Sequence, residues 1–211
     1  SICAIPATPP GRAIRSWGMA LMSSTETLSN ADRAALLAVA RASIQHGLQQ
    51  GQALEAQPDD YPETLRPLRA TFVTLEIGGQ LRGCIGALAA YQPLVRDVAA
   101  HAYAAAFEDP RFPELRPDEF PQLEIHISVL SPPEPLQFAS EDELLAQLRP
   151  GVDGLILHFH HCRATFLPAV WEQLPDPYVF LAQLKQKAGL PLDFWSPELQ
   201  AERYTAEYFG E

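Results

Sequence analysis

Apolar residues recur about every four positions in several stretches of the chain, and each stretch predicts a helix. Between residues 28 and 51 this spacing predicts an amphipathic helix packed on a core. Residues 93–107 follow the same pattern and open with a proline, which suits the first turn of a helix. Residues 140–148 open with a capping-box pattern, and residues 178–188 end at a glycine, so both predict further helices.

Apolar and polar residues alternate in other stretches, which predicts strands. The clearest strand covers residues 123–129. Two extended runs flank Gly78-Gly79 within residues 71–86, a pattern typical of a β-hairpin. A second hairpin is expected within residues 155–167, after a turn at Asp153-Gly154.

These elements together predict the fold class. Strands joined both by hairpins and by helices indicate an α+β fold with a mainly antiparallel sheet packed by helices. The aromatic tail, residues 195–209, is expected to pack as a strand or a helix. The hydrophobic fraction of 47% is enough for a full core, and 211 residues suit one domain or two small lobes.

The charge balance limits the classes of partner. Lys and Arg number 15 against 26 Asp and Glu, a formal net charge of −11. An acidic protein repels the phosphate backbone, and no cluster of Lys and Arg offsets this. No apolar stretch approaches the roughly 20 residues that span a bilayer. Neither nucleic acid nor a membrane is therefore an expected partner.

The cysteine pattern bears on the compartment. Cys3, Cys84 and Cys162 are widely spaced and form no CxxC pair, so they match neither a disulfide framework nor a zinc finger. A reducing cytoplasm is the expected location. Residues 1–24 lack the sustained apolar stretch of a signal peptide. We expect them to be a leader, disordered or artefactual, ahead of a domain that covers residues 25–211.

The most informative segment is Leu81-Arg82-Gly83-Cys84-Ile85-Gly86, in the second strand of the first hairpin. Alternate side chains of a strand share a face, so Arg82 and Cys84 are expected on one face, with Leu81, Gly83 and Ile85 on the other. Glycine in a strand often marks a β-bulge or a place where a ligand or another backbone comes close. Gly83 and Gly86 therefore make this segment a candidate binding site around Cys84.

This hexapeptide resembles the signature of the AMMECR domain family, whose bacterial members are called AmmeMemoRadiSam system protein A. Further segments that resemble the family's, in the family's order, are Phe107–Pro113, Ile125–Pro132, Gly151–Leu155, Thr165–Pro168 and Lys187–Pro191. The resemblance covers roughly residues 28–209. It implies two lobes, each with a sheet, and a cleft between them that the hexapeptide borders. The family has no settled activity, so the resemblance implies a fold and a site but no reaction.

Cys84 is the candidate catalytic residue. A thiol acts as a nucleophile in its thiolate form, which a nearby cation favours, and Arg82 could supply that charge. A catalytic cysteine also needs a base, for which His101 and His126 are the candidates if the fold brings one of them near. The alternative is that Cys84 is a small buried residue beside glycines.

Four charged residues are candidate binding residues. Arg82 can hold a carboxylate or a phosphate with two hydrogen bonds, or can form an ordinary surface ion pair. Glu108, Asp109 and Arg111 lie in a loop after a predicted helix, where binding residues are often presented. The resemblance makes this loop a second wall of the cleft. The alternative is that Asp109, which precedes a proline, only shapes the turn.

Two groups contain histidine. Glu124, His126 and Ser128 share one predicted strand face, either as a proton relay or, more simply, as a solvated polar face. His158, His160 and His161 stand with Cys162 at a predicted hairpin turn, and these are metal-binding residue types. His158 and His160 would share a face, but His161 and Cys162 diverge, and no remote carboxylate or histidine completes the group. We therefore predict no metal site there, with the three histidines as the alternative, and no cofactor is expected.

The expected function combines these features with the resemblance. A binding or accessory protein would hold a small anionic ligand or a partner's peptide at the hexapeptide. The family context implies Memo-like and radical SAM proteins as partners in a modification or redox system. The first alternative is an enzyme that uses Cys84 as a nucleophile or redox thiol. The second alternative is a nucleic-acid-associated regulatory protein.

Overall fold

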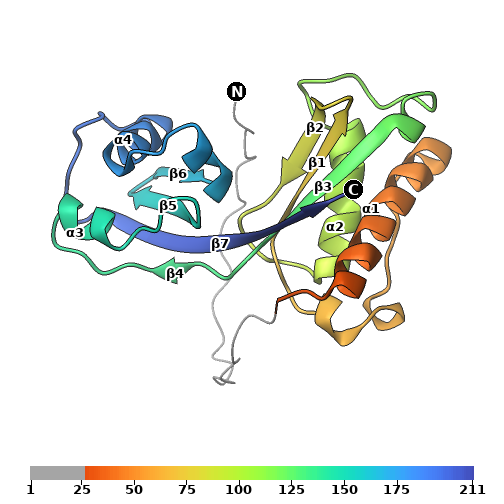
Figure 1. Ribbon diagram of the computed structural model, residues 1–211, viewed down its shortest axis with the longest axis horizontal. Coiled ribbons are helices and arrows are strands. Elements are labelled where there is room, and N and C mark those ends of the chain that lie inside the picture. The colour runs from red at the N-terminus through yellow and green to blue at the C-terminus, as the bar shows by residue number, and fades with distance from the viewer. Residues whose placement is uncertain (1–26) are drawn as a thin grey trace. The chain divides into compact units, whose positions relative to one another are not determined.

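The computed structural model describes residues 27–211, so the leader predicted at residues 1–24 lies outside the described part of the chain. The described residues divide into two compact units (Figure 1). The first contains residues 27–127 together with 209–211, and the second contains residues 128–208. Both combine antiparallel strands with helices, which confirms the predicted α+β class.

Neighbouring strands form the sheet of the first unit in the order β2-β1-β3. They are β1 (Thr71–Ile77), β2 (Gln80–Gly86) and β3 (Leu123–Leu130), whose last residues belong to the second unit. Helix α2 (Leu94–Phe107) packs against β1 and β2, and helix α1 (Asn30–Gln50) packs against α2 (Figure 1). The predicted hairpin and both predicted helices are confirmed, and β2 is left at the edge of the sheet.

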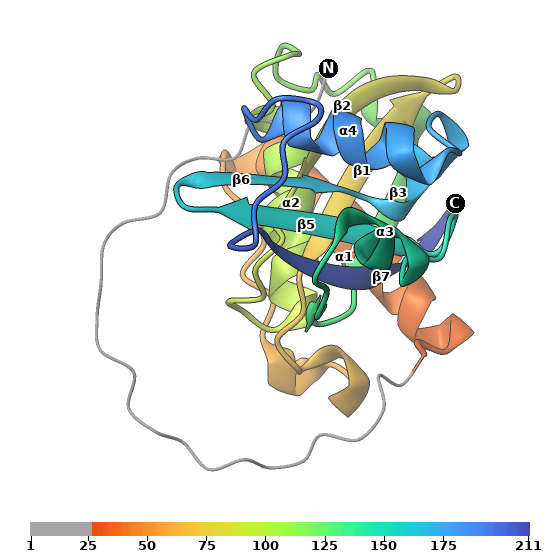
Figure 2. The ribbon, with the colours of Figure 1, turned by 90° about the vertical axis from the view of Figure 1, so that its left-hand side faces the viewer.

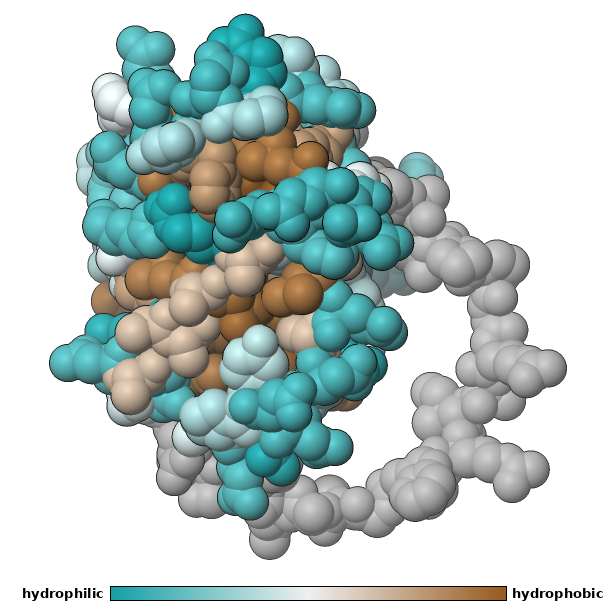
Figure 3. Space-filling view, turned by 90° about the vertical axis from the view of Figure 1, so that its right-hand side faces the viewer, coloured by the Kyte–Doolittle hydropathy of each residue, from teal (hydrophilic) through white to brown (hydrophobic). Residues whose placement is uncertain are grey.

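Helix α1 begins at a capping box. The Ser29 side chain accepts a hydrogen bond from the Asp32 backbone, and the Asp32 side chain accepts one from the Ser29 backbone. The helix ends at Gly51, whose left-handed φ of 70° suits glycine. The exposed residues of this helix include Ala31, Ala34, Ala38 and Ala42. Figure 3 shows hydrophobic residues reaching the surface between hydrophilic ones on the side where α1 lies.

The sheet of the second unit is built around β7 (Gln200–Gly210), which is the aromatic tail. Strand β5 (Asp153–Phe159) pairs with β7 and with β6 (Cys162–Phe166), and the short β4 (Glu134–Pro135) also pairs with β7. All these pairings are antiparallel. The last residues of β7 belong to the first unit.

Helices close the core of the second unit. Helix α4 (Pro177–Lys187) packs against β6 (Figure 2), and helix α3 (Glu141–Ala146) adds two buried leucines. The rings of Trp171 and Phe180 stack with centroids 3.8 Å apart within this core. Short 3-10 helices span Pro58–Asp60, Glu63–Leu65, Phe120–Gln122 and Pro168–Glu172. Within residues 27–211, no helix combines the length and the apolar character that crossing a membrane requires.

The turn predicted at Asp153-Gly154 is wrong, because both residues belong to β5. The chain turns earlier, where Gly151 has a φ of 79°. The Arg149 guanidinium then donates to the Asp153 carboxylate at 2.6 Å and fixes this residue at the start of the strand. An Asp-Gly pair is typical of turns, but here the ion pair and the strand pairing decide its conformation.

Candidate functional site

The β1–β2 hairpin has one face against α2 and one face turned away from it. Val73 and Leu75 are fully buried on the α2 side, and Gly83 lies opposite Leu75. Cys84 lies opposite Thr74, on the other face, and is half-buried. The Thr74 hydroxyl donates a hydrogen bond to the Cys84 sulfur at 3.3 Å. Cys84 therefore stands on the face away from α2, which we call the outer face.

A β-bulge changes the alternation predicted for the hexapeptide. Leu81 lies opposite Glu76, whereas Gly83 lies opposite the preceding residue of β1, so Arg82 is the additional residue of β2. The prediction that Leu81 shares a face with Gly83 is wrong. The bulge places Leu81 on the outer face with Cys84, and its side chain is exposed.

Arg82 makes a buried ion pair with the loop that follows α2. Its ε-nitrogen and one terminal nitrogen donate to the Glu119 carboxylate at 2.9 and 3.1 Å. The same terminal nitrogen donates to the carbonyl oxygens of Pro113 at 3.0 Å and Glu114 at 3.3 Å. Arg82 is only 9% exposed. Its charge is balanced by Glu119, and the guanidinium ties β2 to residues 113–119.

Asp109 and Arg111 hold the backbone of Cys84 at the sheet edge. The Asp109 carboxylate accepts a hydrogen bond from the Cys84 amide at 2.9 Å, and the Arg111 guanidinium donates to the Cys84 carbonyl at 3.1 Å. The two side chains also pair with each other at 2.6 Å. Open backbone groups at a sheet edge can recruit another strand, so these contacts protect the edge at Cys84. Glu108 ends α2 with an exposed side chain.

The carboxyl groups of Asp109 and Glu119 are both held in their charged form. Hydrogen bonding from Arg111 lowers the pKa of Asp109 to about 2, against the opposing effect of burial. Hydrogen bonding from Arg82 lowers the pKa of Glu119 to about 2 in the same way. The loop after α2 is therefore attached to β2 by two carboxylates that stay ionised well below neutral pH.

These pKa values predict that the protein becomes less stable as the pH falls. A carboxyl group whose folded pKa lies below its unfolded pKa stabilises the fold above the unfolded value, near 4. That stabilisation is lost as the pH falls towards the folded pKa, about 2. The free energy of unfolding, measured by urea denaturation, is expected to decline between about pH 4.5 and pH 2. Asp109→Asn should lower it at neutral pH and flatten this decline; an equally steep decline in the variant would contradict the assignment.

The two glycines of the hexapeptide allow close packing. An ideal Cβ on Gly83 would lie 2.0 Å from the backbone oxygen of Ala105 in α2. One on Gly86 would lie 2.4 Å from both the Phe72 ring and the Thr71 carbonyl oxygen. Gly83 lets helix α2 approach the strand, and Gly86 accommodates an aromatic ring. The predicted close approach is therefore by the protein's own atoms at these two positions.

The fold separates the two predicted histidine bases. His101 is buried in α2, with its Nδ1 atom 3.0 Å from the Thr71 hydroxyl and 3.1 Å from the Asp97 carboxylate. This cluster lies on the α2 side of the sheet, whereas Cys84 is on the outer face. His126 stands on β3 near Glu76, which places it on the outer face.

The polar face predicted for β3 is confirmed. Glu124, His126 and Ser128 are exposed or half-buried, and they alternate with buried Ile125 and Ile127. The alternation follows from the sheet, whose other face packs on the helices.

The histidines of the second hairpin are divided between separate acidic partners. His158 lies 3.0 Å from Glu202 on β7, and His160 lies 3.2 Å from Glu198. His160 occupies the turn with a φ of 51°, and His161 is exposed. His158 also lines a groove of about 540 Å³ in the second unit, with Leu136, Phe138 and Leu199.

Two residues that contact the hexapeptide, Thr74 and Glu119, cannot be recognised as its partners from the sequence. Thr74 is one of several polar residues in an alternating strand, and only the bulge brings it opposite Cys84. Glu119 lies 37 positions after Arg82, among other acidic residues in a polar loop. Its pairing with Arg82 depends on the path of the chain after α2.

Comparisons with known proteins show which proteins this chain is similar to. A model of the AMMECR1 family matches residues 37–209. A protein from Methanothermobacter thermautotrophicus is 40% identical over 186 residues, covering 87% of this chain and 96% of its own. A protein from Thermococcus gammatolerans is 40% identical over 185 residues, covering 83% and 88%. The crystal structure of an uncharacterized protein from Pyrococcus horikoshii matches with a TM-score of 0.75 and 34% identity, covering 83% of this chain and 89% of that one.

Proposed function

Because the chain belongs to the AMMECR1 family, we propose that it is an accessory protein that binds a partner through the outer face of the β1–β2 hairpin. The partners proposed from the family context are a Memo-like protein and a radical SAM protein. In this proposal the hexapeptide shapes a fixed surface, and the partner carries out the chemistry.

The observation that carries the proposal is how the charged side chains around the hexapeptide are used. Arg82 pairs with Glu119, and Asp109 pairs with Arg111 while holding the backbone of Cys84. These interactions fix the edge strand in place. A preorganised surface of this kind favours binding, because little conformational entropy is lost when a partner docks.

The outer face also offers apolar surface. Leu81 is 43% exposed beside half-buried Cys84, and it is the apolar side chain of this face that a docked partner would cover. The guanidinium predicted to hold an anion, that of Arg82, is instead paired with Glu119. Protein surface is therefore a better supported ligand than a small anion.

An enzyme that uses Cys84 as a nucleophile receives less support. That mechanism asks for a cation that stabilises the thiolate, and the guanidinium predicted for this role is directed to Glu119. His101, one of the two predicted bases, lies on the other side of the sheet. A nucleic-acid partner is disfavoured by the net charge of −11.

Leu81→Glu is expected to weaken capture of the partner. In a pull-down with the purified Memo-like and radical SAM proteins of the same host, the wild-type chain should retain at least one of them. A buried charge at the centre of the interface should weaken binding by about 2 kcal/mol or more, roughly thirtyfold. Isothermal titration calorimetry with the retained protein measures this loss.

Leu192→Glu is the matched control, because Leu192 is 48% exposed in the second unit. It introduces the same charge at a similarly exposed leucine and should leave the affinity unchanged. The proposal is contradicted if the wild-type chain retains neither protein, or if the two variants lose affinity equally.

A further inference from the structure

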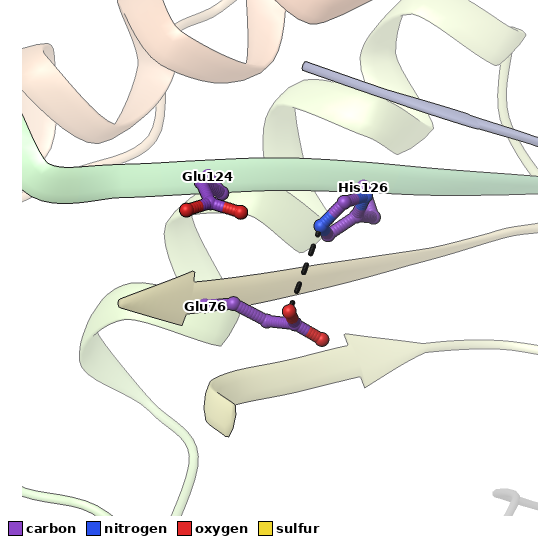
Figure 4. A group of neighbouring side chains, drawn as sticks. All are labelled: Glu76, Glu124 and His126. Atoms are coloured by element: carbon purple, nitrogen blue, oxygen red, sulfur yellow. Dashed lines mark ion pairs between the residues drawn. The ribbon is translucent and has the colours of Figure 1, made fainter. Parts of the chain in front are cut away.

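Three metal-binding side chains converge on the outer face of the first unit. Glu76 extends from β1, and Glu124 and His126 extend from the neighbouring β3, as Figure 4 shows. One donor atom from each residue lies within 4.8 Å of the other two. The group is separate from the histidines at the second hairpin and from the ion pairs that hold Cys84.

The donor atoms of these three residues lie farther apart than hydrogen-bonded atoms, at separations close to those of ligand atoms around one shared cation. The His126 Nε2 atom lies 3.8 Å from the nearer Glu76 carboxylate oxygen, which exceeds a hydrogen-bond length. Zinc bonds of about 2.0 Å to nitrogen and oxygen place tetrahedral ligand atoms about 3.3 Å apart. Small rotations of the glutamate side chains would therefore bring all three donors onto one ion.

The histidine is already oriented for this role. An ideal Cβ on Gly210 would lie 2.1 Å from the Nδ1 atom of His126, so the backbone at the end of β7 packs closely on that side of the ring. Nε2 is the nitrogen directed to Glu76 (Figure 4). The side chains of His126 and Glu76 are 15% and 31% exposed, so their attraction for a cation is screened less than on an open surface.

We propose that Glu76, Glu124 and His126 bind one divalent transition-metal ion, with zinc the best fit. One imidazole and two carboxylates form a ligand set typical of zinc sites with three protein ligands. Such a set leaves a coordination position for water or for an oxygen or nitrogen donor of another molecule. Glu124 is exposed, so the site opens to solvent on that side. The ion also offsets the repulsion between the two carboxylates. Glu76 lies opposite Leu81, so the site adjoins the surface proposed for the partner, but zinc binding to the purified chain does not require that partner.

The test is a titration of the purified full chain with Zn²⁺ alone, followed by competition with a chromogenic chelator. The wild-type chain is expected to bind one zinc ion at this site. Glu76→Gln, Glu124→Gln and His126→Gln should each weaken that binding more than about tenfold, since each removes one ligand. Thermal unfolding of each variant in EDTA should match that of the wild type in EDTA, which shows that the fold is retained.

His158→Gln is the matched control. His158 lies 3.0 Å from Glu202, with side-chain exposures of 30% and 31%, and it stands outside the three-residue group. This variant should bind zinc at the group as tightly as the wild type. The proposal is overturned if the wild type binds no stoichiometric zinc. It is also overturned if zinc binding survives Glu76→Gln and His126→Gln unchanged, or if it is lost in His158→Gln.

Discussion

Gly83→Ala is expected to destabilise the protein by about 3 kcal/mol or more, because the added methyl group collides with the backbone of helix α2. The new Cβ would lie 2.0 Å from the Ala105 carbonyl oxygen and 3.0 Å from its carbonyl carbon. A side chain could rotate away from such a contact, but a helix backbone cannot. The helix would have to move off the sheet and open the core beneath it. Urea denaturation of the two proteins measures the loss.

Gly78→Ala provides the control for that experiment. Gly78 lies in the turn of the same hairpin with a φ of 58°, and nothing lies within 4 Å of its ideal Cβ. Alanine there should destabilise the protein by only about 1 kcal/mol, the cost of a left-handed backbone conformation. Equal losses at the two glycines would show that α2 tolerates the methyl group. A larger loss at Gly83 would mean that this glycine of the hexapeptide serves helix packing.

The sequence predicts the elements of this fold well, because each has a strong local cause. The capping box at Ser29 and the spacing of apolar residues define α1 without help from the rest of the chain. The Gly78-Gly79 pair defines the first hairpin in the same way, since both residues have positive φ. The turn at Asp153-Gly154 fails because its local signal competes with an ion pair from Arg149.

The surroundings of Cys84 are harder to predict because they depend on a one-residue shift in the register between β1 and β2. Counting outward from the Gly78-Gly79 turn without a bulge places Thr74 opposite Gly83, whereas the structure places it opposite Cys84. The bulge turns Leu81 to the outer face and leaves Arg82 as the additional residue. Gly83 is a residue type typical of a bulge, but it does not specify that Arg82 is the additional residue.

The long-range partners are harder still to predict from the sequence. Glu76 and His126 are 50 positions apart, and they meet because β1 and β3 are neighbours in the sheet. The sequence places His126 on a polar strand face, but the identity of the neighbouring strand is a property of the topology. The candidate metal group therefore emerges only when the strand order is known.

Glu119→Gln is expected to lower the free energy of unfolding by about 3 kcal/mol, because it leaves the buried Arg82 guanidinium without its counterion. Arg82 is 9% exposed, and its Nη1 atom already lacks a hydrogen-bond partner within the described residues. Glutamine can accept one of the two hydrogen bonds but carries no charge. The loss should appear as a lower urea midpoint, and residues 113–119 should become more accessible to proteolysis.

Asp118→Asn, at the adjacent residue, is the matched control. It also removes a carboxylate charge that is paired with an arginine, but at an exposed position. The Asp118 carboxylate pairs with Arg116 at 3.1 Å, but these side chains are 70% and 68% exposed, so the change should lower the free energy of unfolding far less than Glu119→Gln does. Replacing both Arg82 and Glu119 by leucine should recover part of the loss, since it removes the unpaired charge along with its partner. Equal costs for Glu119→Gln and Asp118→Asn would mean that the Arg82 guanidinium reaches water when its partner is lost. Arg82 would then be available to bind a ligand instead of serving only as the partner of Glu119.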